Sequence, residues 1–325
     1  MISVVIPVYN EAESLAPLLA ELDRAFTPLG AVEFMFVDDG SRDDSWSILT
    51  TLARREPRVR AIRFRRNFGK AAALTAGFRS TRGAIVFTLD ADLQDDPAEA
   101  PRFLERLDEG YDVVSGWKQI RHDPWHKVWP SRLFNAVVSR LTGCRLHDHN
   151  CGFKAYRRIV LDEVDIYGEL HRFIPVLAAA RGFRVGEVVV RHRPRKYGRS
   201  KYGWSRLFKG FLDLLTVRFL TGFGQRPLHV LGVPALLLMG LGLLGLGWLA
   251  GLWLAGQGPI GGRPLLAYSA AALGVGVQLL CLGILAELVT SYHIRTHPTY
   301  SVADRLEGEA LATRSPEQTP HGSTL

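Results

Sequence analysis

"GAIVFTLDADLQDDP", residues 83–97, joins an apolar run to four aspartates and a glutamine. The run Ala84–Phe87 is typical of a buried strand, and the carboxylates follow directly where that strand ends. Acidic clusters usually lie on a solvated surface, but open α/β sheets bind their ligands at the carboxyl ends of the strands. The stretch therefore predicts a parallel sheet with a polar site behind this strand.

The segments on both sides of this strand repeat the same pattern. Short apolar runs alternate with segments of helical periodicity, which predicts a Rossmann-like, mostly parallel α/β sheet with helices on both faces. We expect the polar strand ends at 7–11, 37–40 and 90–94 to meet at one edge of that sheet. The predicted strands are 2–9, 32–40, 59–64 and 83–90, and the predicted helices are 13–26, 43–56 and 69–81.

The acidic stretch suggests a metal site. Asp90 and Asp92 are separated by one residue, so both carboxylates can approach one point on a turn. Mg²⁺ and Mn²⁺ prefer oxygen ligands, few of them from the protein and the rest from phosphates and water. With Gln94 beside them, the two aspartates predict a site where Mg²⁺ or Mn²⁺ holds a diphosphate. The alternative is a solvated turn that caps the next helix, a role that suits Asp95 and Asp96.

Two further polar stretches follow predicted strands. In "FVDDGSRDDS", residues 36–45, Asp38 and Asp39 can accept hydrogen bonds from a nucleobase imide or a ribose, or they can simply cap a helix. In "RRNFGK", residues 65–70, Lys70 begins a predicted helix, where backbone N–H groups favour anions. An ordinary solvated lysine is the alternative at that position.

The composition changes after residue 227. Residues 228–255 contain no Asp, Glu, Lys or Arg, and residues 265–292 contain one acid, Glu287. Each segment exceeds the ~20 apolar residues that cross a bilayer as a helix, which predicts a transmembrane hairpin. Small residues allow helices to pack closely, within the hairpin or between copies of a homo-oligomer. The glycines in question are Gly240, Gly242, Gly245, Gly247 and Gly251.

Basic residues gather just before the hairpin. The net charge is +8, and the segment from Arg191 to Lys209 holds eight Lys or Arg residues and no acid. A polybasic segment beside a span indicates contact with anionic lipid headgroups, so we expect no nucleic-acid partner. Because Lys and Arg mark the cytoplasmic side, the large domain and both termini are predicted to be cytoplasmic.

The chain therefore divides into four predicted parts. Residues 126–141 and 204–223 mix apolar and basic residues at helical spacing, so both can lie in the membrane interface. For 126–141 an ordinary core-facing helix is the alternative. The parts are a cytoplasmic catalytic domain (1–203), an amphipathic juxtamembrane helix (204–226), two transmembrane helices (227–292) and a polar tail (293–325) predicted to be disordered.

Six sequence blocks carry a family resemblance. In chain order they are "VVIPVYNE", "VDDGSRDDS", "RRNFGKAAALTAGF", "TLDADLQDDP", "DHNCGFKAYRR" and "RKYGRSKYG". They resemble the family-2 glycosyltransferases of the dolichyl-phosphate mannose synthase type. Within that type they most resemble the bacterial polyprenyl-phosphate glycosyltransferases with a C-terminal two-span anchor. The resemblance covers residues 1–292.

The resemblance implies a fold, a reaction and a location. The fold is of the GT-A type, and the reaction inverts the anomeric carbon of the transferred sugar. The donor is a nucleotide sugar, with UDP and GDP both open, and the acceptor is a polyprenyl phosphate such as undecaprenyl phosphate. The protein is then a multi-pass protein of the bacterial inner membrane.

Carried over position by position, the resemblance also implies site residues. For the nucleoside pocket these are Pro7, Tyr9, Glu11, Val37 and Asp39. For the rest of the donor they are Asp90, Ala91 and Asp92, with Gln94 at the metal and Lys118 in a segment where relatives often carry a basic residue. For phosphate contacts they are Arg132 and a basic loop with Arg195 and Lys201. The family's Asp-(aromatic)-Asn-Cys-Gly reads Asp148-His149-Asn150-Cys151-Gly152, so a histidine stands where relatives carry an aromatic residue.

These residues suggest a mechanism. The metal, Arg195 and Lys201 would stabilise the negative charge that grows on the diphosphate as the sugar leaves. The acceptor is a phosphate monoester with a second pKa near ~6, so its oxygen is largely ionised and needs no strong general base. Asp92 is the candidate catalytic carboxylate at the metal, and Asp148 is the candidate for positioning or base catalysis. For Asp148 a structural contact to the following turn is the alternative.

Two other functions remain open from the sequence. An Asp-X-Asp pair after a strand also occurs in haloacid-type phosphatases, where the first aspartate, here Asp90, is the nucleophile. That chemistry does not explain the nucleoside-type blocks. The second alternative is a scaffold that binds a nucleotide sugar or a lipid phosphate without catalysis.

Overall fold

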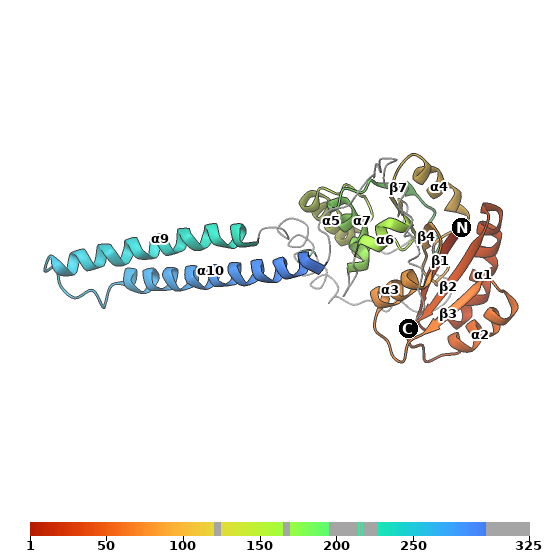
Figure 1. Ribbon diagram of the computed structural model, residues 1–325, viewed down its shortest axis with the longest axis horizontal. Helices are drawn as coiled ribbons and strands as arrows, with labels where there is room; N and C mark the ends of the chain where they lie inside the picture. The colour runs from red at the N-terminus through yellow and green to blue at the C-terminus, as the bar shows by residue number, and fades with distance from the viewer. Residues whose placement is uncertain (120–124, 165–169, 195–213, 215, 217–226, 297–325) are drawn as a thin grey trace, which may run out of the picture.

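The computed structural model describes residues 1–119, 125–164, 170–194, 214, 216 and 227–296, and for 125–133 and 291–296 it describes the backbone alone. Within these ranges the chain forms an α/β domain and a long helical hairpin that projects from it (Figure 1). Arg195, Lys201 and the side chain of Arg132 therefore lie outside the described part of the chain.

One sheet of seven strands forms the centre of the domain. The strand order is β3-β2-β1-β4-β6-β5-β7. Strands β1 to β4 are parallel, β6 runs antiparallel to both of its neighbours, and β7 is parallel to β5. This confirms the predicted mostly parallel sheet. The strands are β1 Ile2–Val8, β2 Val32–Asp38, β3 Val59–Arg63, β4 Ile85–Thr88, β5 Val113–Trp117, β6 Lys154–Arg157 and β7 Val185–Val189.

Helices cover both faces of the sheet (Figure 1). Successive strand residues point to opposite faces, so Val4 and Ile6 pack under α1, α2 and α4, whereas Val5 packs under α3, α6 and α7. The helices are α1 Ala12–Phe26, α2 Ser45–Arg55, α3 Lys70–Ser80, α4 Ala100–Asp108, α5 Trp125–Thr142, α6 Arg158–Glu163 and α7 Ile174–Ala180, with short 3-10 turns η1 Thr27–Leu29, η2 Pro97–Glu99 and η3 Leu170–Phe173.

Helix α3 approaches the sheet closely because it has a glycine at the contact point. A Cβ atom on Gly77 would overlap the Cγ1 atom of Val5 and lie 3.4 Å from the Cγ2 atom of Val37. Interiors are close-packed, so an added methyl group has no free space here. The close packing brings Lys70, the first residue of α3, to the carboxyl edge of the sheet.

The carboxyl ends of β1, β2 and β4 meet as predicted. In the sheet register Val8 lies opposite Asp38, and Val5 lies opposite Thr88. The loops beyond β1 and β2 are also joined, since the Asn10 N–H donates to Ser41 Oγ at 2.9 Å. One edge therefore collects the polar strand ends.

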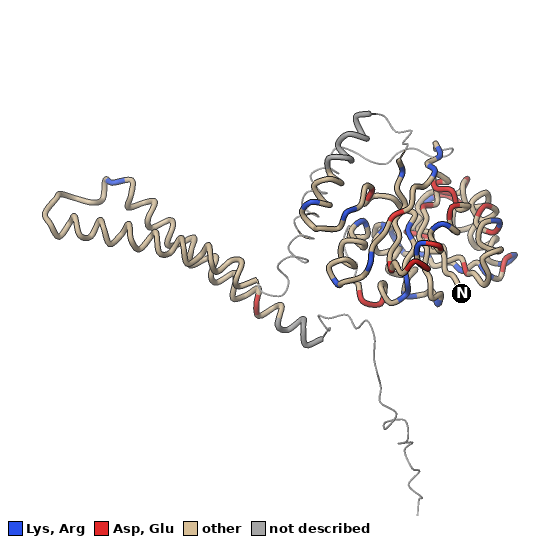
Figure 2. Tube along the Cα trace, turned by 90° about the horizontal axis from the view of Figure 1, so that it is seen from above, with Lys and Arg blue, Asp and Glu red and all other residues tan. Residues whose placement is uncertain are grey.

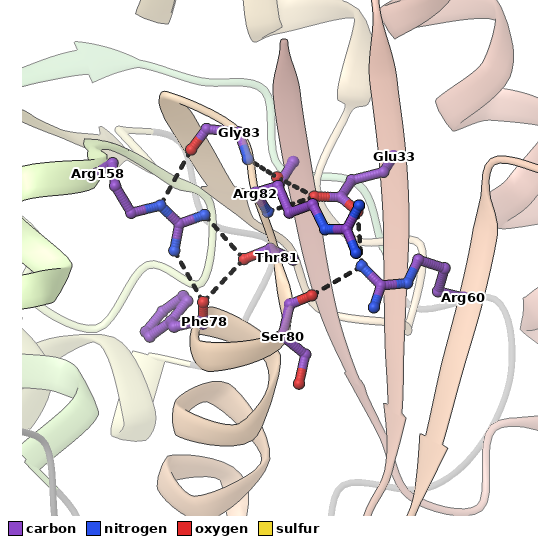
Figure 3. Close-up of polar contacts among 9 residues, drawn as sticks. Glu33, Arg60, Phe78, Ser80, Thr81, Arg82, Gly83 and Arg158 are labelled. Atoms are coloured by element: carbon purple, nitrogen blue, oxygen red, sulfur yellow. Dashed lines mark hydrogen bonds and ion pairs between the residues drawn. The ribbon is translucent and has the colours of Figure 1, made fainter. Parts of the chain in front are cut away.

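The amino edge of the sheet carries a separate polar network (Figure 3). The buried Glu33 carboxylate accepts from the Ser3 hydroxyl and the Arg82 N–H, both at 2.7 Å, and from Arg60 at 3.0 Å. Burial alone would raise the pKa of Glu33, but these bonds lower it below its ordinary value. Beside it, the Arg158 guanidinium donates to backbone carbonyls and a hydroxyl at the end of α3. Together these contacts fix the turn between α3 and β4.

The hairpin consists of α9, Pro227–Leu254, and α10, Pro264–Thr296, which lie side by side (Figure 1). The described chain has two helices long and apolar enough to cross a membrane, Pro227–Leu254 and Pro264–Thr290, with mean hydropathies of 2.2 and 2.1. Most of their apolar surface is exposed; the Leu244 side chain, for example, is 72% exposed. Figure 2 shows that charged residues are confined to the loop between the helices and to the domain end of α10. These properties match the predicted transmembrane hairpin.

The glycines of α9 divide into two groups. A Cβ on Gly242 or Gly245 would come too close to Ser269 on α10, so these two glycines let the helices pack tightly. A Cβ on Gly240, Gly247 or Gly251 would meet no atom within 4 Å. Of the five predicted packing glycines, two therefore serve the hairpin itself.

Glu287 joins the two helices at the domain end of the hairpin. Its Oε2 atom accepts a hydrogen bond from the Leu228 N–H at 3.2 Å. Leu228 lies in the first turn of α9, where backbone N–H groups have no partner within the helix. Glu287 thus supplies one of those missing acceptors.

Part of the predicted interfacial region also packs against the domain. Leu214 is 3% exposed and lies in a cluster with Val138 of α5 and Phe173. On another side of α5, Val137 and Leu141 are 38% and 45% exposed. Helix α5 thus has both a core-facing side and an exposed apolar side. Contact of the region 204–226 and of α5 with a membrane remains a prediction.

Candidate active site

In the acidic stretch after β4, apolar residues that pack in the core alternate with aspartates. Leu89, Ala91 and Leu93 are buried in the core beneath α1 and α4. Asp90 and Asp92 occupy the positions between them, at the carboxyl edge. Leu93 adopts a φ of +61°, a left-handed conformation that is costly for a side chain with a Cβ. Apolar residues thus anchor the loop, and of the two carboxylates between them Asp90 is half-buried and Asp92 is buried, 8% exposed.

Asp90 lies among cationic groups. Its Oδ1 atom bonds the ammonium group of Lys70 at the start of α3. Burial alone would raise the pKa of Asp90, but Lys70, and after it Lys118, lower it to about 2. Asp90 is therefore a carboxylate at any physiological pH. The predicted helix start at Lys70 is confirmed, and contact between Lys70 and a ligand anion remains a prediction.

Gly152 forms the wall against which the Asp90 carboxylate lies. A Cβ on Gly152 would stand 2.5 Å from Asp90 Oδ2, closer than real contacts allow. The Thr88 hydroxyl donates to the Gly152 carbonyl at 2.8 Å and holds the two segments together. The glycine of the "NCGF" block is therefore required by the space that Asp90 occupies.

Lys154 holds the turn that contains Gly152. Its side chain is buried, and its ammonium group donates to the backbone carbonyls of His149, at 3.3 Å, and Cys151. Burial lowers the pKa of Lys154 below its ordinary value. A buried lysine in a strand is costly, so its hydrogen bonds to the turn account for its presence.

His149 links the same turn to α5. It is fully buried, and its Nε2 atom lies 3.0 Å from the Ser139 hydroxyl. Burial lowers the pKa of His149 to about 4, so the ring is neutral near pH 7. Asn135 of α5 also donates to the His147 carbonyl at 2.9 Å. This chain thus uses a neutral histidine to hold the turn to α5, the helix that carries Arg132.

Asp148 is buried at the start of the turn, 1% exposed. Its Oδ1 atom accepts the Asn150 N–H at 3.0 Å, which is the structural contact considered as the alternative to a catalytic role. Asp148 acts electrostatically on His149 and Lys154 by raising their pKa values. A positioning or base role toward the acceptor remains a prediction.

An open cleft lies beside the ends of β1, β2 and β3. Its volume is about 620 Å³, and its lining includes Tyr9 and the segments 40–42 and 63–67. Its walls are mainly basic and aromatic, which suits the phosphate and base of a nucleotide. Tyr9, predicted to contact the nucleoside, thus lines a cavity of suitable size.

The two aspartates that end β2 hold the walls of this cleft. Asp38 is fully buried and accepts from the Ser41 N–H at 2.9 Å, with Arg63 at 3.4 Å. Asp39 accepts from the Phe68 N–H at 2.7 Å and from the Gly69 N–H at 2.9 Å. Burial raises the pKa of Asp39 above its ordinary value. Asp39 therefore shapes the loop in front of α3, and a nucleobase contact remains a prediction.

Three other predicted nucleoside residues occupy different settings. Pro7 lies in β1 opposite Val37 of β2, whose side chain is fully buried in the core under α3. Glu11 precedes α1, and its N–H donates to the Ser45 hydroxyl at 3.0 Å. Pro7 and Glu11 are partly exposed at the site edge, whereas Val37 can reach a ligand only through its backbone.

The second half of the acidic stretch has two structural roles. Asp96 accepts from the Ala98 N–H at 3.1 Å and caps η2, as predicted. Asp95 is 2% exposed and pairs with the ammonium group of Lys118 at 2.6 Å. Burial would lower the pKa of Lys118, but Asp95 raises it well above its ordinary value. The structure thus places Lys118 under the loop, and direct contact between Lys118 and the donor remains a prediction.

The donor set fits a cation that takes most of its ligands from a substrate. The described residues contain no group of three or more His, Cys, Asp or Glu side chains that could enclose a metal. Mg²⁺ needs only one or two carboxylates when phosphates and water supply the rest, and Asp90 and Asp92 are two such carboxylates. Gln94, the third predicted ligand, has its Nε2 atom 3.4 Å from His192 Nε2.

The sequence reasoning missed His171 and Lys154. His171, in η3, is 9% exposed, and its charge would act on both Asp90 and Lys70. Burial lowers the pKa of His171 well below its ordinary value, so it is neutral near pH 7. A polar "LHRF" segment beside an apolar helix was the available signal for His171. For Lys154 the signal was a lysine inside the short strand "KAYR".

Comparison with known proteins identifies the family to which the chain is similar. The model of the family described as "Glycosyl transferase family 2" matches residues 3–165. The chain is 36% identical to the dodecaprenyl-phosphate galacturonate synthase of Rhizobium johnstonii, over 96% of this chain and 94% of the relative. It is 39% identical to the undecaprenyl-phosphate 4-deoxy-4-formamido-L-arabinose transferase of Pseudomonas aeruginosa, over 93% and 89%. The predicted resemblance to polyprenyl-phosphate glycosyltransferases is confirmed.

Solved structures share the fold of the α/β domain. The crystal structure of glucosyl-3-phosphoglycerate synthase from Mycobacterium tuberculosis superposes with a TM-score of 0.51 at 19% identity, over 68% of this chain and 80% of that one. A structure of the same enzyme with Mn²⁺, UDP and phosphoglyceric acid also has a TM-score of 0.51. The predicted GT-A fold is confirmed. By its site, its fold and its relatives, the chain belongs to glycosyl transferase family 2.

Proposed function

We propose that this protein transfers a sugar from a nucleotide-sugar donor to a polyprenyl phosphate at the membrane surface. The observation that carries the proposal is the Asp90 carboxylate, held between Lys70 and Gly152 at the carboxyl end of β4. At the same edge of the sheet, a cleft of about 620 Å³ lies beside the ends of β1, β2 and β3. The apolar hairpin supports the choice of a lipid acceptor. The two relatives named above are also named for sugars joined to dodecaprenyl and undecaprenyl phosphate.

The donor nucleotide binds in the cleft. Tyr9 lines it, and we assign Pro7, Glu11, Val37 and Asp39, which lie in or just after β1 and β2, to the nucleoside. The diphosphate then extends toward the first turn of α3, where backbone N–H groups and Lys70 favour negative charge. Both UDP and GDP fit this general arrangement, so the base is left to the experiment.

A divalent cation, Mg²⁺ or Mn²⁺, would be held by Asp90 and Asp92 with Gln94 nearby. The presence of Mn²⁺ and UDP in the M. tuberculosis structure of the same fold supports this choice. When bound, the ion neutralises charge that develops on the leaving diphosphate. Lys70 supports the same charge from the start of α3, and the Asp95–Lys118 pair holds the loop from beneath.

The chain's own residues orient the two reactants. The acceptor phosphate is largely ionised at neutral pH, so its oxygen can attack the anomeric carbon directly and invert it. Arg132 on α5, with Arg195 and Lys201, would bind the phosphates. Asp148, in the buried turn beside Gly152, would position the acceptor side. Catalysis then comes mainly from electrostatic stabilisation of the leaving diphosphate and from orientation of the two reactants.

The hairpin holds this site at the depth of the lipid phosphate. Helices α9 and α10 cross the inner membrane, and the basic segment before them contacts anionic headgroups on the cytoplasmic face. The α/β domain and both termini then face the cytoplasm. Cysteine accessibility labelling at Gln257, in the loop between the helices, tests this orientation: labelling from the periplasm supports it and labelling from the cytoplasm contradicts it.

The test is transfer by the purified full chain in detergent with undecaprenyl phosphate and Mn²⁺. The donor panel includes UDP- and GDP-linked sugars, with galacturonic acid and 4-formamido-arabinose among the sugars because two relatives are named for them. We expect one donor to give a lipid-linked sugar and free nucleoside diphosphate. Asp92→Asn should abolish the divalent-dependent transfer without unfolding the protein. Release of free phosphate would instead indicate a phosphatase, and binding without turnover a scaffold.

A further inference from the structure

A short segment after β7 runs beside the acidic loop. His192 forms an antiparallel bridge with Asp95, and the Arg193 N–H donates to the Gln94 carbonyl at 2.9 Å. His192 Nε2 also lies 3.4 Å from the Gln94 side-chain amide. Backbone and side-chain contacts thus fix residues 192–193 to residues 94–95.

Arg193 adds a second set of contacts at the same place. Its guanidinium bonds Glu21 of α1 at 2.7 Å and Asp96 of the acidic loop at 2.7 Å. The Arg193 side chain is 33% exposed, and the carboxylates of Glu21 and Asp96 are 26% and 12% exposed. The fork geometry of arginine suits such a two-sided contact better than lysine would. One side chain therefore ties the acidic loop to α1 and to the chain that leaves β7.

The loop has a position that needs this support. Leu93 is held at a φ of +61°, a strained conformation that persists only where the surroundings fix it. The Gln94 N–H donates to Asp92 Oδ1 at 3.2 Å, so a shift of Gln94 would be passed to the Asp92 carboxylate. On the far side of Gln94, its carbonyl is bonded to Arg193. A continuous set of contacts thus leads from the Arg193 N–H through Gln94 to Asp92, and the Arg193 guanidinium holds that backbone in place by bonding Glu21 and Asp96.

We infer that Arg193 is a positioning residue that holds the 90–96 loop in the geometry in which Asp90 and Asp92 bind a divalent cation. The inference rests on the proposed function, because it concerns the same metal-diphosphate site. Arg193 itself touches neither the metal nor the donor and acts through Gln94 and Asp96. In the sequence it stands two residues before Arg195.

The inference predicts a change in metal affinity. Removing an outer-shell partner typically weakens metal binding by about 10–100-fold. We therefore expect Arg193→Gln to raise the Mn²⁺ dissociation constant by about tenfold, measured by electron paramagnetic resonance on the full chain in detergent without donor. At saturating Mn²⁺ the kcat of the variant should return to within about twofold of wild type, because the ligands themselves are intact. Arg193→Lys should lie between the two.

The matched control is Arg191→Gln. It removes the same charge from the same segment, but the Arg191 side chain is 82% exposed and lies 3.7 Å from Glu99. Exposed pairs of this kind contribute little, so the control should bind Mn²⁺ as wild type does. Equal weakening by both variants would show a general charge effect and overturn the inference. If Arg193→Gln does not fold, the Mn²⁺ affinity of Arg193→Lys decides: weakening supports the inference, and wild-type affinity overturns it.

Two further variants separate this inference from the proposed function. If Asp92→Asn binds Mn²⁺ as wild type does, the metal site itself is wrong. If Asp92→Asn loses Mn²⁺ but Arg193→Gln binds it with wild-type affinity, only the role of Arg193 is wrong. The double variant Asp96→Asn with Arg193→Gln should bind Mn²⁺ no more weakly than the weaker single variant, because both act through one contact. Additive losses would contradict that shared path.

Discussion

Glu33 and Asp90 are both carboxylates in the central sheet region, yet they lie at opposite edges and have different partners. Glu33, at the amino edge, accepts from a hydroxyl, a backbone N–H and Arg60, all of which belong to neighbouring strands and turns (Figure 3). Asp90, at the carboxyl edge, is bonded to the flexible side chain of Lys70 and lies against Gly152. Both pKa values are lowered despite burial, which alone would raise them.

The two carboxylates differ in whether their bonding partners can leave them for a ligand. The partners of Glu33 are fixed by the fold, so its charge stabilises the turn before β4 and nothing else. The ammonium group of Lys70 stands at the end of a long side chain, so it can turn from Asp90 to a phosphate. A similar pKa shift therefore accompanies a structural role at one edge and the proposed binding role at the other. The predictions below test that division.

The largest effect is expected for Asp90→Asn. Loss of one charged contact to a developing charge commonly reduces turnover by about 10²–10³-fold, and we expect at least that loss in sugar transfer. The melting temperature should also fall, because the lowered pKa of Asp90 means that its charge stabilises the folded chain, but transfer per folded molecule should fall far more. Transfer to undecaprenyl phosphate measures the first effect and thermal unfolding the second. The control is Asp108→Asn on the exposed end of α4, and a full transfer rate for Asp90→Asn would remove Asp90 from the site.

Gly152→Ala should have the next largest effect. A Cβ at this position would stand 2.5 Å from Asp90 Oδ2 and must push the carboxylate aside. A misplacement of about 1 Å can reduce turnover by about 10²-fold. We expect that loss in kcat with the folded structure retained, measured beside Gly247→Ala, whose Cβ would meet no atom within 4 Å. Wild-type turnover in Gly152→Ala would show that Asp90 need not occupy its present position.

Glu33→Gln should show the opposite pattern. Hydrogen bonds to charged groups contribute about 1.5–3 kcal/mol, so the variant should be destabilised by about 2 kcal/mol. That corresponds to a melting temperature lower by roughly 5 °C for a domain of this size. Transfer per folded molecule should stay within about twofold of wild type. A variant with normal stability and reduced transfer would contradict the structural role assigned to Glu33.

Acidification should reproduce part of that effect in the wild type. Because the pKa of Glu33 is lower in the folded chain than its ordinary value of 4.5, its stabilising contribution is present above pH 4.5. The contribution is lost as the pH falls through the folded pKa, where protonation becomes favourable even in the native state. Melting temperatures of wild type and Glu33→Gln should therefore converge below pH 4.5. A constant difference down to pH 3 would exclude Glu33 as the source.

The smallest effect is expected for Ser139→Ala. The variant leaves the buried Nε2 atom of His149 without the Ser139 hydroxyl, which also bonds the Leu146 carbonyl at 2.8 Å and the Leu146 N–H at 3.3 Å. Stability should fall by about 1–2 kcal/mol, and the Michaelis constant for the lipid acceptor should rise more than that for the donor, because α5 carries Arg132. Equal changes in both constants would show that the His149–Ser139 contact supports the domain as a whole.

The sequence predicted the first four strands and three helices because their signals are local. The apolar runs of β1, β2, β3 and β4 and the helical periodicity between them are readable without knowing any long-range contact. The antiparallel strand β6 was not predicted. It is four residues long and contains the buried Lys154, whose side chain is stabilised by carbonyls of the preceding turn and not by apolar packing.

The candidate site could be predicted in outline for a similar reason. Asp90, Asp92 and Asp39 follow strands, and parallel strands bring their ends together. The pairings Lys70 with Asp90 and Lys118 with Asp95 depend on the packing of α3 and on the order of strands in the sheet. Gly152 belongs to a block carried over from the family, but the sequence does not show why a glycine is needed there. The structure does, because a Cβ at this position would meet the Asp90 carboxylate.

The bond between Glu287 and the Leu228 N–H has a consequence for how the anchor behaves in a membrane. A lone span can slide along its axis and roll about it, and it takes the attached domain with it. Here Glu287, near the end of α10, bonds the Leu228 N–H in the first turn of α9. If the two helices moved apart or shifted along each other, that amide proton would be left without an acceptor in lipid. The register between the two helices is therefore set at the end nearest the α/β domain.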